Sequence, residues 1–97
     1  MADLYSEIRP DVRWMAEYLE SRGIEYRSYN HGVQFNVVDS AGVIHSYYPT
    51  TGTLVLHEGN EQNKRKTVTL RNQNMYQLIN YIMDPEEIQR LIRKENE

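Results

Sequence analysis

The chain has 97 residues, 26% of which are charged, with a formal net charge of −3 and no cysteine. This length suits one domain, so we expect residues 1–97 to form a single domain with one modest core. Without cysteine the chain forms neither a disulfide scaffold nor a thiolate metal site. The negative net charge argues against a broad basic surface for non-specific duplex binding, but it is compatible with a local basic patch.

The sequence contains neither a membrane span nor a secretion signal. No apolar run approaches the roughly 20 residues that cross a bilayer. The first residues, MADLYSEIRPD, lack the basic and then apolar pattern of a signal peptide. We therefore expect a cytoplasmic protein with no membrane partner.

The first expected element is a helix over residues 10–22. Pro10 suits the first helical turn, and Gly23 suits the left-handed residue that follows a helix. Trp14 and Tyr18 lie four residues apart and form a second, aromatic stripe. The core stripe recurs at helical spacing and consists of Ile8, Val12, Met15 and Leu19.

Strands are expected at 24–29, 33–38, 43–47, 53–57 and 67–70, because apolar and polar residues alternate there between turn residues. Pairing Tyr26 with Phe35, Val38 with Val43 across the turn Asp39-Ser40-Ala41-Gly42, and Tyr47 with Thr53 gives one common buried face. The predicted inward residues from 33 to 56 are Val33, Phe35, Val37, Ile44, Tyr48, Leu54 and Leu56. The predicted outward residues are Arg27, Tyr29, Gln34, Asn36, His45, Tyr47, Val55 and His57.

Two more helices should follow the strands. Asn72 or Asn74 is expected to cap the first, whose core residues are Met75, Leu78, Ile79 and Ile82. Asp84-Pro85-Glu86-Glu87 predicts the start of the second, over residues 85–94. The predicted fold is therefore α+β, with the order α-β(4–5)-α-α and the helices packed on one face of an antiparallel meander sheet.

Sequence motifs for catalysis or metal binding are missing. His45 and His57 are expected to face outward on neighbouring strands, but no third or fourth ligand stands at a recognisable spacing. The sequence has no phosphate-binding glycine loop, zinc-protease motif or nucleophile elbow. We expect a non-enzymatic protein with no catalytic residue, metal or cofactor.

The open sheet face is the candidate working surface, and three interpretations of it remain. Aromatic and basic groups on an open sheet are typical of single-strand nucleic-acid binding, since bases stack on rings and phosphates meet cations. The candidate residues are Arg27, Tyr29, Asn36, His45, Tyr47 and His57, flanked by Lys64, Arg65, Lys66 and Arg71. Alternatively this face is simply solvated. In the third interpretation, this face or the Trp14/Tyr18 stripe contacts a host protein or a second copy.

The stretch VIHSYYPTTGTLVLH resembles the Tyr-Pro-x-Thr-Gly hairpin of small uncharacterised bacteriophage and prophage proteins. Residues 18–26 and 74–82 resemble the segments before and after that hairpin in the same family. The resemblance extends to Met83 and implies a shared fold, a phage-type accessory role and a bacterial host cytoplasm, but no chemistry. The family's Gly-Arg-Gly-like stretch is replaced here by TLRNQN, which puts the role of that loop in doubt.

Two other folds offer weaker similarity. The helix–sheet–helix order is similar to that of double-stranded-RNA-binding domains, but Arg71 to Asn74 stand where their lysine cluster begins, so we reject that family. The hairpin is also similar to the Tyr-Pro-Ser-Gly-Lys turn of TATA-binding-protein-like domains, which bind nucleic acid through an open sheet. Here Thr53 replaces the lysine.

Overall fold

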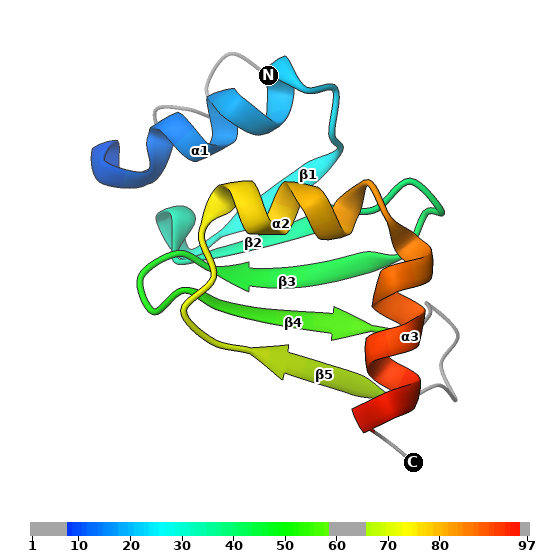
Figure 1. Ribbon diagram of the computed structural model, residues 1–97. Coiled ribbons are helices and arrows are strands. Elements are labelled where there is room, and N and C mark those ends of the chain that lie inside the picture. Colours follow the sequence, from blue (N-terminus) through cyan, green and yellow to red (C-terminus); the bar gives the residue numbers. More distant parts are fainter. Residues whose placement is uncertain (1–7, 59–65, 96–97) are drawn as a thin grey trace.

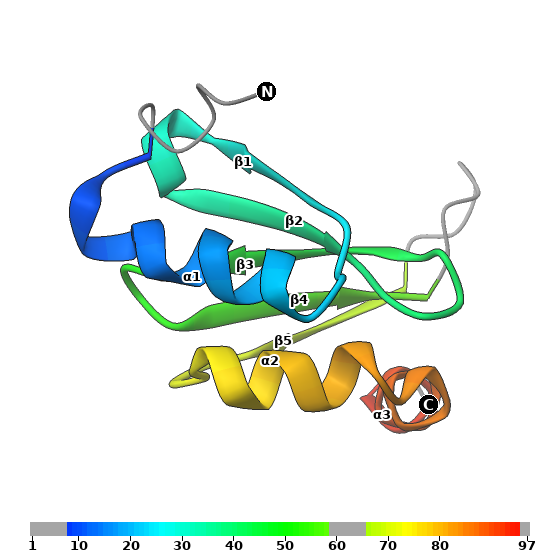
Figure 2. The ribbon, with the colours of Figure 1, turned by 90° about the horizontal axis from the view of Figure 1, so that it is seen from above.

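A computed structural model describes residues 8–58 and 66–95 of the chain. The helices are α1 (Pro10–Ser21), α2 (Met75–Ile82) and α3 (Pro85–Glu95), with a short 3-10 turn, η2 (Asn30–Gly32). The strands are β1 (Tyr26–Tyr29), β2 (Gln34–Val38), β3 (Ile44–Tyr48), β4 (Thr53–His57) and β5 (Thr67–Leu70). They form one antiparallel sheet in the order β1-β2-β3-β4-β5 (Figure 1). Figure 2 shows all three helices on the same side of this sheet. The predicted α+β meander is confirmed.

Helix α1 starts at Pro10 as expected and ends at Ser21, one residue earlier than predicted. Gly23 has a φ of +70°, and the N–H of Ile24 donates to the carbonyl of Leu19 over 3.0 Å. This left-handed turn closes the helix and directs the chain into β1. The helix buries Val12, Ala16 and Leu19, whereas Met15 is only partly covered.

The η2 turn docks against the start of α1. Gly32 has a φ of +96°, and a Cβ atom added there would lie 2.7 Å from Cγ2 of Val12. Only glycine permits both this backbone conformation and this close approach. The turn places Tyr29 opposite Gln34 and Tyr26 opposite Val37. We predicted Tyr26 opposite Phe35; because that error is two residues, each side chain keeps its predicted face.

The C-terminal helices are set by local capping and by contacts to the sheet. Asn74 caps α2 through a reciprocal pair with Gln77, at 2.9 and 2.8 Å. The N–H of Ser40 donates to the carbonyl of Ile82 over 3.1 Å, which ties the β2–β3 turn to the end of α2. Helix α3 begins at Pro85, as predicted, and packs across β4 and β5.

The buried side chains form one core cluster between the sheet and the helices. From the sheet it contains Phe35, Val37, Tyr47, Leu54, Leu56 and Val68. From the helices it contains Val12, Ala16, Leu19, Met75, Leu78, Ile79, Ile82, Ile88 and Ile92. None of the helices in residues 8–58 and 66–95 is long and apolar enough to cross a membrane.

Candidate functional site

The sheet face opposite the helices presents an ordered array of side chains. One complete cross-strand row runs Arg27, Asn36, Ser46, Val55 and Thr69, one residue from each strand. Two residues further along the strands, Tyr29 pairs with Gln34, and Tyr48 pairs with Thr53. These positions are all partly or fully exposed, in contrast to the buried residues that alternate with them. Together these nine residues are called the open face below.

The face assigned to β3 was wrong. Val38 pairs with Ile44, and Phe35 pairs with Tyr47, so β3 is inverted relative to the prediction. His45 and Tyr47 are 0% and 1% exposed and belong to the core side, whereas Ile44 is 43% exposed. Ser46 and Tyr48 take the outward positions instead. Val33, also predicted to be inward, is exposed just before β2.

The inversion follows from the lengths of two turns. Five residues, 39–43, connect the paired residues Val38 and Ile44, where four were predicted. Four residues, 49–52, connect Tyr48 and Thr53, where five were predicted. Each error shifts the register by one residue and exchanges the faces. Because the two errors have opposite sense, they cancel at β4, and Leu54 and Leu56 are buried as predicted.

A buried carboxylate holds the longer of these turns. Oδ1 of Asp39 accepts hydrogen bonds from the N–H groups of Ala41 and Val43, both at 2.9 Å. Oδ2 lies 2.8 Å from Nε2 of His45, and Nδ1 of His45 accepts from the N–H of His57 at 2.9 Å. Since Nδ1 is an acceptor, the proton of the neutral ring is on Nε2 and is donated to Asp39. The imidazole thus bridges the turn and the end of β4.

This network makes His45 a structural residue. Burial lowers the pKa of His45, although its hydrogen bond and charge interaction with Asp39 act in the opposite direction. The ring of His57 stacks on that of His45 with centroids 6.2 Å apart. Burial and the neighbouring His45 also lower the pKa of His57. The structure therefore removes His45 and Tyr47 from the candidate surface and engages His57 in the network.

The basic and aromatic groups that remain are spread over the sheet and its two edges. Arg27 and Tyr29 are exposed on β1, and Tyr48 is half-buried on β3. Arg71 and Lys66 are exposed at opposite ends of β5. None of the five strands in the described residues contains an aspartate or glutamate. Lys64 and Arg65 lie outside the described residues.

The polar centre of the open face is internally hydrogen-bonded. Oδ1 of Asn36 accepts from Nε2 of Gln34 at 2.9 Å and from Oγ of Ser46 at 3.2 Å. This arrangement orients the amide of Asn36 so that its NH₂ group remains as a donor. A shallow hollow of about 70 Å³ lies beside it and is lined by Glu25, Tyr26, Arg27, Tyr29, Asn36, Val38 and Ile44.

The second predicted aromatic group lies elsewhere, in the helical layer. Trp14 is 44% exposed on α1. Tyr18 is half-buried and meets Tyr76 of α2 edge to face, with ring centroids 5.5 Å apart. Tyr76 is 60% exposed and was not predicted as a surface residue of interest. These three rings are therefore a separate surface from the open face.

Neither a metal site nor a similar protein indicates what these surfaces do. Among residues 8–58 and 66–95, no three histidine or acidic side chains are grouped so that they would hold a metal ion. Comparison of the chain with protein-family models, curated proteins and solved structures finds no match.

Two important residues were misjudged from the sequence. Asp39 was interpreted only as a turn residue, and Tyr48 was placed in the core. The available signal was the Asp39-Ser40-Ala41-Gly42-Val43 segment, because an aspartate before a glycine often bonds to the backbone N–H groups that follow it. Such a bond is compatible with the longer turn, which would have placed Tyr48 outward.

Proposed function

We propose that this protein is a non-enzymatic binding protein that holds single-stranded nucleic acid on the open face. The observation that carries the proposal is the local composition of that face. It combines Tyr29 and Tyr48 with Arg27 and the adjacent Arg71, on strands that contain no carboxylate. The chain as a whole has a net charge of −3, but its carboxylates lie outside the five strands, with Glu25, Asp39 and Glu58 at strand ends.

The geometry of the face suits a flexible strand better than a rigid duplex. The exposed ring of Tyr29 on β1 and the half-buried ring of Tyr48 on β3, with β2 between them, provide stacking surfaces for unpaired bases, each worth about 1–3 kcal/mol. The guanidinium groups of Arg27 and Arg71 supply partners for phosphates. Between them, the Asn36 NH₂ group supplies a hydrogen-bond donor toward base edges. A sheet face with few cations does not provide the extended basic surface on which duplex binding depends.

A direct test is fluorescence anisotropy with labelled oligo-dT and oligo-U of about 15 nucleotides at low salt. We expect saturable binding that weakens as salt is raised, since phosphate contacts release counterions. Tyr29→Ala should weaken binding several-fold, whereas the matched control Tyr76→Ala, on the helical layer, should not. Arg27→Gln should reduce the salt dependence, with Arg93→Gln on α3 as its control. Absence of binding to both oligonucleotides at low salt would refute the proposal.

The biological setting is part of the same proposal. The resemblance of the hairpin to small phage proteins supports an accessory role in a phage or prophage, within the cytoplasm of a bacterial host. A protein contact through Trp14, Tyr18 and Tyr76 is the second candidate function, because aromatic side chains are enriched at interfaces. A host protein or a second copy would then be the partner, with no role for nucleic acid. Light scattering measures the molar mass in solution and so tests directly whether the partner is a second copy.

A further inference from the structure

The shallow hollow of about 70 Å³ beside Asn36 lies at one end of the open face. Its position follows from the strand pairing. Val38 pairs with Ile44, two residues along the strands from the row that contains Arg27 and Asn36. The N–H of Val38 donates to the carbonyl of Glu25 over 3.0 Å, just before β1 begins. Glu25, Val38 and Ile44 therefore form the next cross-strand row, and all three line the hollow.

The apolar part of the hollow is the pair Val38 and Ile44. Val38 is half-buried, whereas Ile44 is 43% exposed on a face that is otherwise mostly polar. A planar ring that lay on this pair would remove apolar surface from water. The volume is well below the 300 Å³ or more of an enclosed ligand site, so the hollow holds only part of a ligand. One base of a longer strand meets that description.

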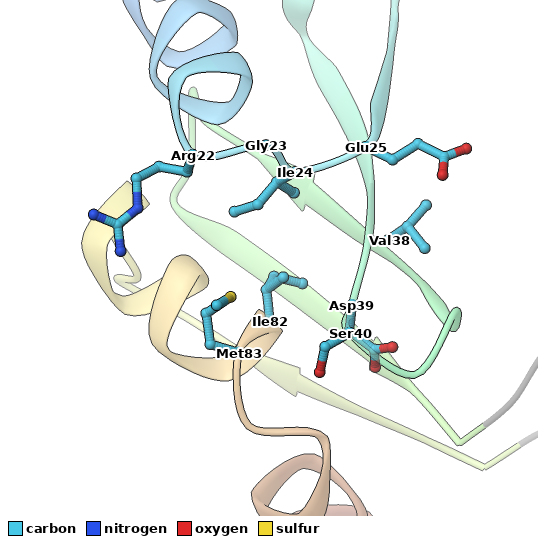
Figure 3. A pocket seen from close by; sticks show the side chains of 9 residues that line it. All are labelled: Arg22, Gly23, Ile24, Glu25, Val38, Asp39, Ser40, Ile82 and Met83. Atoms are coloured by element: carbon cyan, nitrogen blue, oxygen red, sulfur yellow. The ribbon is translucent and has the colours of Figure 1, made fainter.

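Two polar groups at the rim present a hydrogen-bond donor beside an acceptor. Oδ1 of Asn36 already accepts from Gln34 and Ser46, so Asn36 offers the hollow only its NH₂ group. The carboxylate of Glu25 is exposed, and nothing in the described part of the chain pairs with it. Figure 3 shows a second pocket, of about 340 Å³, and the Glu25 carboxylate points out of it, away from Met83.

The spacing and the charges of the rim favour a base edge over a phosphate at this point. Glu25 and Asn36 are diagonal neighbours on adjacent strands, a relationship that places residues about 7–8 Å apart. A flat ring can bridge such a gap with hydrogen bonds at both ends of one edge. Glu25 and Arg27 contribute one negative and one positive charge to the rim. The carboxylate repels phosphate, so its ligand is a hydrogen-bond donor, while Arg27 remains available for the strand backbone.

We propose that the hollow binds guanine in a single strand that lies on the open face. The Glu25 carboxylate accepts from N1–H and from the N2 amino group, the Asn36 NH₂ group donates to O6, and the ring lies on Val38 and Ile44. Guanine matches best because its Watson–Crick edge has two neighbouring donors beside an acceptor, whereas adenine, cytosine and thymine each have a single donor group there. This base preference rests on the proposed function, because the strand must already lie on the open face.

The test is fluorescence anisotropy with a series of oligonucleotides of about 15 nucleotides. Each is oligo-dT with one central dG, deoxyinosine, dA or dC, and unmodified oligo-dT is the reference. We expect the dG oligonucleotide to bind about fivefold more tightly than the reference, the lower end of the discrimination that a bidentate base contact gives. Inosine keeps N1–H and O6 but lacks the N2 amino group, so it should lose most of this preference.

A variant at the acceptor separates base preference from strand binding. Glu25→Ala should bring the dG oligonucleotide to within twofold of oligo-dT, since the two donors of guanine lose their partner. Binding of oligo-dT itself should be unchanged or stronger, because a charge that repels phosphate is removed. The matched control is Glu17→Ala, which removes an exposed carboxylate on α1 and should retain the preference.

The possible failures are distinguishable. Equal binding of the dG oligonucleotide and oligo-dT, or tighter binding of the dA or dC oligonucleotide, would overturn the guanine preference and leave strand binding in place. A dG preference that survives Glu25→Ala, or that inosine reproduces in full, would overturn it too. If no member of the series binds, strand binding on the open face is refuted and the guanine preference with it.

Discussion

Nε2 of His45 lies 2.8 Å from Oδ2 of Asp39, and both side chains are buried beneath the β2–β3 turn. The contact joins a turn to a strand, and through Nδ1 it also reaches the backbone of β4. A hydrogen bond between an aspartate and a histidine also occurs in catalytic sites. Its burial and its complete set of hydrogen bonds instead give it a structural role, in which it stabilises the turn length and hence the face that β3 presents.

Asp39→Ala should destabilise the protein by roughly 2–4 kcal/mol, because it removes the acceptor for two backbone N–H groups and for His45. Urea unfolding followed by circular dichroism measures this change. The control is Glu17→Ala, which removes an exposed carboxylate in the middle of α1. If Asp39→Ala lowers the free energy of unfolding no more than the control does, the carboxylate does not hold the turn.

Stability should decrease as the pH falls below about 6.5, the ordinary pKa of histidine. Burial lowers the pKa of His45 in the folded protein, so the unfolded chain binds a proton there first. The neutral His45 ring therefore makes its full contribution to the free energy of unfolding above the pKa that it has in the unfolded chain. This contribution is lost as the pH falls through the pKa that His45 has in the folded protein. His57, whose pKa is also lowered, contributes with the same sign.

The measurement is thermal unfolding between pH 7.5 and 5.5, a range above the ordinary pKa values of the carboxylates. His45→Gln and His57→Gln, made separately, apportion the effect between the two rings. A pH dependence that both variants leave unchanged would exclude the histidines as its source.

The inverted face of β3 can be tested with paired β-branched substitutions. Ile44→Thr should change the free energy of unfolding by only about 0.5 kcal/mol, because Ile44 is exposed. Val37→Thr, on the neighbouring strand, should cost about 1–3 kcal/mol because it places a hydroxyl in the core. Urea unfolding compares them. A larger cost at Ile44 than at Val37 would favour the register with Ile44 buried.

Gly32→Ala should be more costly than Gly42→Ala, although both glycines have a positive φ. An added Cβ at Gly32 would lie 2.7 Å from Val12 and 3.0 Å from Ile8, whereas that at Gly42 meets nothing within 4 Å. The difference should be about 1–3 kcal/mol, the usual cost of overpacking. Thermal unfolding of the two variants gives the comparison. If both variants lose the same stability, backbone strain alone accounts for the cost of Gly32→Ala.

The sequence by itself determined which segments form helices and strands and most of the buried residues. It did so because helical spacing, strand alternation and capping residues are local signals: Pro10, Gly23, Asn74 and Pro85 mark helix boundaries close to where the structure has them. The buried faces of β2 and β4 also follow from alternation within each strand.

Tertiary structure decided the face of β3 and the composition of the open face. The Ile44–Tyr48 segment has large side chains on both faces of the strand, so alternation alone does not identify its buried side. The choice depends on the hydrogen bonds that lengthen the β2–β3 turn, on His45 bridging Asp39 to the backbone of His57, and on Tyr47 donating to the carbonyl of Gln73. Those partners come from the β2–β3 turn, from β4 and from the segment beyond β5. The hollow between Glu25 and Asn36 is likewise a tertiary feature, because it forms only where β1, β2 and β3 lie side by side.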